Sequence, residues 1–162
     1  EVLGLKYKEG ISPQQLLEVF ERKVEKEKLS EDLTIYRIRD AGPEGGPVAI
    51  PFEGPGLWGP VKGFLALQSD MRTVRAISFY QQEETPGLGG EIATDQFENQ
   101  FKGQSIVGPD GQVGMVLVSG GKATEKNEVD AITGATMTST KVQMMLNHTI
   151  RDIVKETRTN VR

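Results

Sequence analysis

The sequence predicts an α+β domain with a mostly antiparallel, twisted sheet and a helix near each end of the chain. Apolar residues recur at helical spacing near both ends. Between them lie consecutive short runs rich in branched and aromatic residues, separated by clusters of Gly and Pro. Helices around a run of consecutive strands are typical of the α+β class. The length of 162 residues fits one domain, spanning residues 1–162.

The N-terminal region, about residues 1–45, is predicted to contain one helix and one strand. Ser12 stands where a helix N-cap belongs, Pro13 occupies the first helical position, and Gln15 completes a capping box. Helical spacing continues from there, and we expect the helix to span about residues 13–28. Branched and aromatic residues at 33–39 then predict a strand.

The middle of the chain is predicted to supply most of the sheet. Residues 41–59 are rich in Gly and Pro and are expected to form a loop around a short edge strand at 48–52. Two further strands, at 61–68 and 74–81, are joined by a loop of hairpin size.

The remaining elements alternate between short structures and one long helix. Thr94 is expected to cap a helical segment that reaches about residue 101. A strand at 113–119 and a polar loop at 120–128 follow. Apolar residues at helical spacing predict the closing helix at about 139–156.

The composition excludes several classes of function. A net charge of −4 gives no basic footprint for nucleic acid. The absence of cysteine excludes disulfides, thiol catalysis and cysteine metal sites, and the single histidine, His148, excludes a multi-histidine site. No apolar run reaches the roughly 20 residues that span a bilayer. The chain opens on charged residues without a signal peptide, so we expect a trimmed or mature fragment.

A segment rich in hydroxyl groups lies directly before the closing helix. Gly134 and Ala135 leave its backbone accessible, and either Thr138 or Ser139 is expected to cap the helix. A helix start offers unpaired N–H groups and the positive end of the helix dipole, which together favour a phosphate. Taken alone, the segment is explained more simply as a helix cap, because Ser and Thr favour that position in all helices.

Three segments, in this order, resemble a known family. Residues 130–136 are similar to the flavinylation motif Asp-x-x-(Ser/Thr)-Gly-Ala-Thr of the C subunit of the sodium-translocating NADH:quinone reductase and of the G subunit of the related Rnf complex. Gly-Leu-Trp at 56–58 and Gly-Gly-Glu at 89–91 look more like the former. The resemblance covers about residues 54–147. The motif positions are held by Asp130, Thr133 (where serine is commoner), Gly134, Ala135 and Thr136.

The resemblance implies a covalent cofactor. In this family the last threonine of the motif bonds FMN through a phosphoester, which a flavin transferase installs with FAD as donor. The acceptor here is therefore expected to be Thr136, with Thr138 as the next candidate. Asp130 belongs to the motif that the transferase recognises; its alternative is a turn residue on a solvated loop.

The other two segments have side chains suited to a flat, partly apolar ring. Apolar side chains can lie against its faces, glycines allow close backbone approach, and polar groups can meet its edge or the ribityl chain. Glu84 is expected to accept a ring N–H or a ribityl hydroxyl. The alternatives are core packing for Trp58 and an ordinary turn for residues 85–90. The candidate contacts are Leu57, Trp58, Glu84, Thr85, Leu88 and Gly89.

The implied function is electron relay. A flavin supplies the electron chemistry, which agrees with a sequence that offers no convincing acid–base catalyst. The family places such a domain on the periplasmic face of the bacterial inner membrane, among other subunits of a respiratory complex that passes electrons to quinone with coupled ion transport. The N-terminal membrane helix of those subunits is absent from this chain. The alternatives are an Rnf-type subunit, a noncovalent FMN reductase and a flavin-free extracytoplasmic module.

Overall fold

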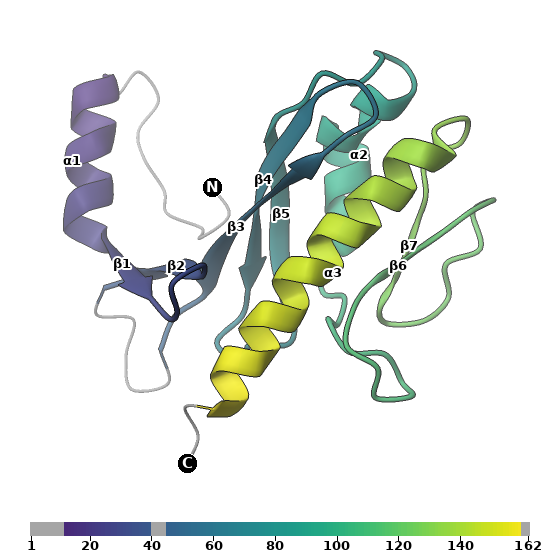
Figure 1. The fold of residues 1–162 in the computed structure, drawn as a ribbon. Coiled ribbons are helices and arrows are strands. Elements are labelled where there is room, and N and C mark those ends of the chain that lie inside the picture. The colour runs from purple at the N-terminus through teal and green to yellow at the C-terminus, as the bar shows by residue number, and fades with distance from the viewer. Residues whose placement is uncertain (1–11, 40–44, 160–162) are drawn as a thin grey trace.

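The computed structural model describes residues 12–39 and 45–159. Parts of the predicted N-terminal region and of the predicted loop at 41–59 lie outside these residues. Five antiparallel strands form one sheet in the order β1-β2-β3-β4-β5. The long helix α3 (Thr136–Thr159) lies across one face of this sheet, and α1 (Pro13–Lys23) stands beside it (Figure 1). The predicted α+β class, with a helix near each end, is confirmed.

The start of α1 is as predicted, but its end is not. The Ser12 hydroxyl accepts the Gln15 N–H at 3.3 Å and the Gln15 side chain accepts the Ser12 N–H at 3.0 Å, which confirms the capping box. The helix then ends at Lys23 instead of continuing to residue 28. The next five residues form β1 (Val24–Lys28).

Strand pairing explains this early end. β1 pairs antiparallel with β2 (Thr34–Ile38), with Val24 opposite Ile38 and Lys28 opposite Thr34. Val24 is buried in a small cluster that includes Tyr36. Glu and Lys favour helix by a few tenths of a kcal/mol per residue, a preference that tertiary contacts routinely override.

The predicted short edge strand is the central strand of the sheet. β3 (Val48–Pro55) pairs with β4 (Pro60–Leu67) along its whole length, and β4 pairs with β5 (Val74–Gln81) across the predicted hairpin. On the other side, β2 pairs only with Val48 and Ala49. Within the described residues, the rest of β3 therefore has one neighbouring strand. Pro51, which lacks an N–H, is tolerated there because one edge has no partner.

The second half of the chain packs short elements beside the sheet. Thr94 caps α2 (Asp95–Glu98), as predicted, and the segment continues through η2 (Asn99–Phe101). The 3-10 helix η1 (Gly89–Ala93) precedes it. The predicted strand at 113–119 shrinks to β6 (Val116–Val118), which pairs in parallel with β7 (Glu128–Asp130). β7 was not predicted, because three residues are too few for a recognisable alternation.

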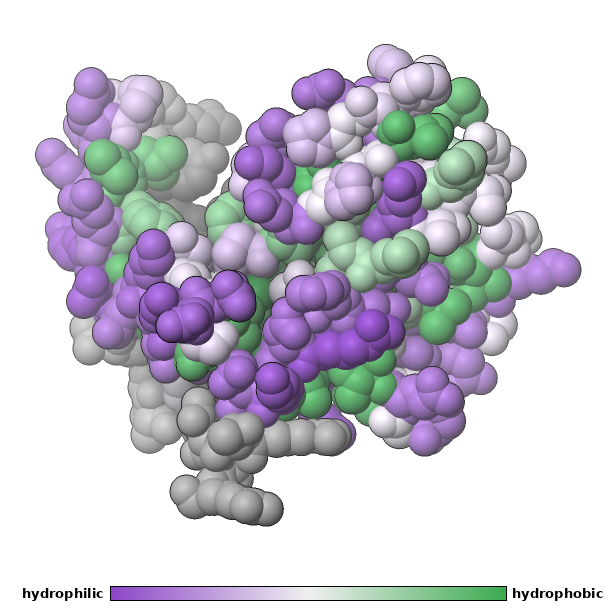
Figure 2. Space-filling model, viewed as in Figure 1, coloured by the Kyte–Doolittle hydropathy of each residue, from purple (hydrophilic) through white to green (hydrophobic). Residues whose placement is uncertain are grey.

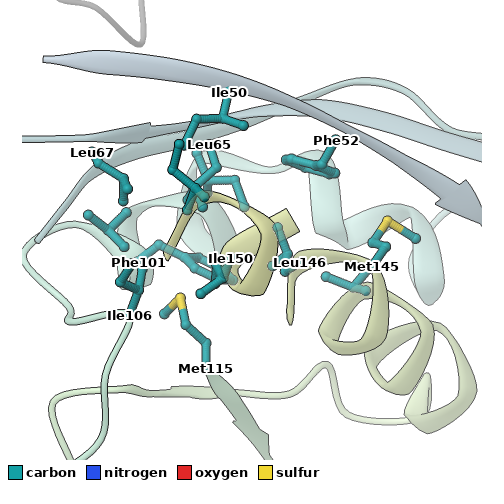
Figure 3. Packing of buried hydrophobic residues seen from close by; sticks show 14 of the residues in the cluster. Ile50, Phe52, Leu65, Leu67, Phe101, Ile106, Met115, Met145, Leu146 and Ile150 are labelled. Atoms are coloured by element: carbon teal, nitrogen blue, oxygen red, sulfur yellow. The ribbon is translucent and has the colours of Figure 1, made fainter. Parts of the chain in front are cut away.

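One hydrophobic core joins the sheet to α3. Phe52 and Leu65 point from the sheet toward Met145, Leu146 and Ile150 of α3 (Figure 3). Phe101, Ile106 and Met115 close the core from the elements beside the sheet. Among the helices of the described residues, none combines the length and apolar content that a membrane crossing requires.

Gly63 is expected to be essential for this packing. A Cβ at this position in β4 would overlap the Phe52 ring and the backbone oxygen of Ser78. Gly63→Ala should therefore destabilise the fold by about 1–3 kcal/mol, the usual range for overpacking. At about 2–4 °C per kcal/mol for a chain of this size, calorimetry should show a clear fall in melting temperature. Gln81→Ala, at the exposed end of β5, is the control; an unchanged melting temperature in Gly63→Ala would contradict the packing.

Candidate functional site

Three segments that are far apart in the sequence enclose a cleft of about 350 Å³ at the start of α3. They are the turn between β3 and β4, the loop after β5, and the segment that leads into α3. The cleft contains every predicted site residue except Asp130 and Thr133, together with Met137, which sequence reasoning missed although it follows Thr136 directly. The lining residues are Leu57, Trp58, Glu84, Thr85, Leu88, Gly89, Gly134, Ala135, Thr136, Met137 and Thr138.

Helix α3 begins three residues before its predicted start, at Thr136. Gly134 has a φ of +78°, a left-handed conformation that glycine adopts without steric cost. The Ala135 N–H closes the turn by donating to the Ile132 oxygen at 3.1 Å. The expectation that Thr138 or Ser139 caps the helix is therefore wrong, because both residues lie within its first turn.

The hydroxyl groups of this segment fall into two classes. Thr138 and Ser139 are each 2% exposed. The Ser139 hydroxyl accepts the Ile132 N–H at 3.1 Å, and the Thr138 hydroxyl donates to a Glu84 carboxylate oxygen. Thr136 is exposed at the rim of the cleft, on the first turn of α3. Of these three, Thr136 thus has the accessible hydroxyl, whereas Thr138 would have to leave a buried hydrogen bond to serve as an acceptor.

Glu84 connects all three segments of the cleft. Its side chain is 4% exposed, and one carboxylate oxygen accepts the N–H groups of Leu57 at 2.8 Å and Trp58 at 3.0 Å. The other oxygen accepts the Thr138 hydroxyl. The sequence led us to expect Glu84 to bind the ring or the ribityl chain, and this contact stays a prediction. In the structure its carboxylate accepts hydrogen bonds from three protein donors.

Two glycines leave the space that this carboxylate occupies. A Cβ on Gly56 would lie 2.5 Å from one Glu84 oxygen. A Cβ on Gly89 would lie 2.8 Å from the other oxygen and 2.6 Å from the Thr138 hydroxyl. These separations are too short for real contacts, so the close approach of the backbone requires glycine at both positions.

The mouth of the cleft carries exposed apolar side chains. Trp58 is 70% exposed, so the alternative of core packing is wrong for this residue. Leu57, Leu88 and Met137 are exposed around it. Figure 2 shows hydrophobic residues at the surface near the upper end of the molecule, where α3 begins. Exposed aromatic and aliphatic groups around a hollow provide the surface that a flat aromatic ligand needs.

Asp130 and Thr133 line a different cleft, of about 580 Å³, between α2 and the segment before α3. A carboxylate oxygen of Asp130 accepts the Ala123 N–H at 2.9 Å, and its backbone N–H donates to Gln100 at 2.8 Å. Thr133 is exposed on the turn. The two halves of the 130–136 segment therefore face two separate clefts.

The groups of the cleft at α3 that suit an anion belong to the backbone. Among the described residues, those that line it include no lysine, arginine or histidine. The first N–H groups of α3 and the positive end of its dipole remain as the anion-binding elements. The described residues also hold no group of three or more His, Asp or Glu side chains suited to a metal ion.

Together, the fold and the site define a small α+β domain with a cleft suited to a flat ligand that bears a phosphate. The apolar mouth fits the flat part, and the start of α3 fits the phosphate. Residues 56–151 match the family model described as the FMN-binding domain, and the chain belongs to this family.

Individual relatives agree with the family. The chain is 40% identical over 108 residues to the C subunit of the Na(+)-translocating NADH-quinone reductase of Pasteurella multocida and 40% identical over 114 residues to that of Yersinia pestis. These matches cover 67% and 70% of this chain but only 42% and 43% of the relatives. The chain thus spans less than half the length of these relatives.

Solved structures share the fold. The structure of the corresponding reductase subunit from Parabacteroides distasonis has a TM-score of 0.64 and 33% identity over 76% of this chain and 62% of that one. The NqrC structure from Shewanella oneidensis has a TM-score of 0.70 over 84% of this chain and 82% of that one, and its 22% identity supports the fold alone.

Gly89→Ala is expected to distort the cleft from inside. The added methyl group would press against the Thr138 hydroxyl and Glu84, and a broken buried hydrogen bond costs about 1–3 kcal/mol. The melting temperature should fall by several degrees, about 2–4 °C per kcal/mol, in calorimetry. Leu88→Ala, which removes an exposed side chain next to it, should have a smaller effect. Equal melting temperatures for the two variants would contradict the close approach at Gly89.

Proposed function

We propose that Thr136 carries FMN through a phosphoester bond. The observation that supports this most strongly is the exposed Thr136 hydroxyl at the rim of the cleft, on the first turn of α3. With FAD as donor, the threonine oxygen bonds to the phosphorus of the FMN half, the bond to the adenylate half breaks, AMP leaves and the hydroxyl proton is lost. The helix start stabilises the phosphate.

The remaining lining residues would hold the flavin. Leu57, Trp58 and Leu88 offer apolar faces for the isoalloxazine ring, and Thr85 offers a hydroxyl. The exposed Gly134 leaves the backbone open to close approach, and the buried Gly89 and Ala135 form part of the cleft wall. The flavin would supply the electron chemistry, and the chain would fix its position and exclude water from its faces.

Asp130 and Thr133 would act during maturation. Both lie in the segment that resembles the flavinylation motif, yet they line the neighbouring cleft and not the one beside Thr136. We assign them to recognition by the flavin transferase, with Asp130 also holding the loop at Ala123 in place.

The role that follows is electron relay within a respiratory complex. The relatives are named as the C subunit of a Na(+)-translocating NADH-quinone reductase. We propose the same membership for this chain, with the other subunits as partners, electrons passing toward quinone, and a position on the periplasmic face of the inner membrane. The sodium-type complex is favoured over the Rnf type by these relatives and by the Gly-Leu-Trp turn at the cleft.

Thr136→Val should abolish FMN attachment. The substitution removes the acceptor oxygen from an exposed position, so the fold should be retained. After co-production with a flavin transferase, intact-mass measurement should show wild type heavier by FMN less one water and Thr136→Val unmodified. Thr140→Val, which alters an exposed hydroxyl one turn further along α3, is the control and should be modified. A modified Thr136→Val would show that the acceptor is another residue.

The same samples separate covalent from reversible binding. Yellow colour that stays with the denatured wild-type polypeptide supports the phosphoester, whereas complete release of flavin supports a noncovalent FMN protein. A spectrum without flavin bands would favour a flavin-free module. Because the described residues that line the cleft include no cationic side chain, Thr136→Val should also bind added free FMN weakly.

Trp58 provides a second test, since it is the only tryptophan in the chain. In flavin-free protein its exposed indole should be quenched readily by acrylamide. A flavin ring resting on the indole should shield it and strongly reduce its emission. Steady-state fluorescence of flavin-bearing wild type and flavin-free Thr136→Val makes the comparison. Identical emission and identical acrylamide quenching in the two samples would place the ring away from Trp58.

A further inference from the structure

The Glu84 carboxylate lies at the point where the three segments of the cleft come together. Three segments meet at this one buried carboxylate: the turn after β3, the loop after β5, and the first turn of α3. Such a carboxylate accepts hydrogen bonds from all sides and thereby fixes the separation of the groups that donate them. It is thus the side chain that ties its own loop to both of the other segments of the cleft.

The packing around Glu84 leaves it little freedom. Gly56 approaches one carboxylate oxygen and Gly89 the other, at separations that exclude even a methyl group. Its backbone N–H also donates to the Gln82 side chain at 2.6 Å. The side chain is therefore held in one place, and it holds Thr138 in turn.

Thr138 transmits this constraint to the acceptor. It lies two residues after Thr136 in the same helical turn, so its hydrogen bond to Glu84 sets where that turn lies relative to the cleft. Ser139 fixes the other side of the turn through the Ile132 N–H. Thr136 itself is exposed, and the placement of its hydroxyl follows from these two neighbours.

We propose that Glu84 is a positioning residue for FMN attachment: its hydrogen bonds to Thr138, Leu57 and Trp58 hold the Thr136 hydroxyl at the rim of the cleft that receives the flavin. This inference rests on the proposed function. Glu84 does not contact the reacting atoms in this role. It keeps the start of α3 and the turn after β3 at a fixed separation. The acceptor hydroxyl and the site of the ring are then correctly spaced.

The test measures the rate of FMN attachment to the purified flavin-free chain, with flavin transferase and FAD, by intact mass over time. Misplacement of a reacting group by about 1 Å can slow a reaction about a hundredfold, so Glu84→Ala should be between about ten- and a hundredfold slower than wild type. Glu84→Gln keeps the shape, accepts the two N–H groups and donates to the Thr138 hydroxyl. It should stay within about threefold of wild type, because all three hydrogen-bonded pairs are kept and only the direction of the bond to Thr138 is reversed.

Two conservative substitutions at Thr138 test the same hydrogen bond. Thr138→Val removes the hydroxyl at nearly constant volume and should slow attachment. Thr138→Ser restores the hydroxyl and should restore the rate. Ile35→Ala, in the core at β2, lowers stability far from the cleft and should be modified at the wild-type rate.

Hydrogen exchange of the flavin-free chain gives a readout that does not depend on FMN. The Leu57 and Trp58 amides should lose protection in Glu84→Ala and keep it in Glu84→Gln. Attachment at wild-type rate in Glu84→Ala, or equal slowing in Glu84→Ala and Ile35→Ala, would overturn the positioning role while leaving the proposed function intact. A wild-type chain that takes up no FMN, or a Thr136→Val variant that does, would overturn the proposed function and this inference together.

Discussion

The site depends on how the first turn of α3 is fixed in space. Below that turn, Val142, Leu146 and Ile150 are fully buried in the core shared with the sheet. At the turn itself, two buried hydroxyl groups bond in different directions, Ser139 to the Ile132 backbone and Thr138 to Glu84. A helix start held in this way presents its N–H groups and its dipole at one defined place, which anion binding requires.

The topology of the sheet brings the other two segments to the same place. In an antiparallel meander, the turn that joins β3 to β4 lies at the same end as the exit from β5. The Leu57–Trp58 turn and the loop that starts near Glu84 are therefore neighbours although they are 26 or 27 residues apart. α3 runs back across the sheet with its start at this end, which completes the cleft (Figure 1).

The sequence predicted those parts of the structure that depend on local chemistry. The capping box at Ser12, the Thr94 cap and the hairpin between β4 and β5 follow from rules that act within a few residues. Elements defined by distant partners could not be predicted in this way. The strand at Val24–Lys28 exists because it pairs with β2, and β7 exists because it pairs with β6. The site likewise has a part that the sequence predicted and a part that it could not. Motifs in the sequence pointed to most of the residues that gather in the cleft. The hydrogen bonds of Glu84 and the second cleft at Asp130 depend on tertiary contacts and were not predicted.

The charges of the cleft give a physical reason for the proposed covalent bond. FMN carries a phosphate dianion, yet the described lining residues include the buried Glu84 carboxylate and no cationic side chain. A helix start contributes roughly 0.3–1 kcal/mol toward an anionic group when exposed, and up to about 2 kcal/mol in a partly buried geometry. That contribution alone is far below the roughly 8 kcal/mol that micromolar affinity requires, so reversible binding would depend on the ring contacts. A phosphoester at Thr136 would remove this requirement, since a tethered flavin stays beside its cleft at an effective concentration that the short link sets. The Glu84 carboxylate can then serve to join the three segments of the cleft, which its hydrogen bonds do in this structure.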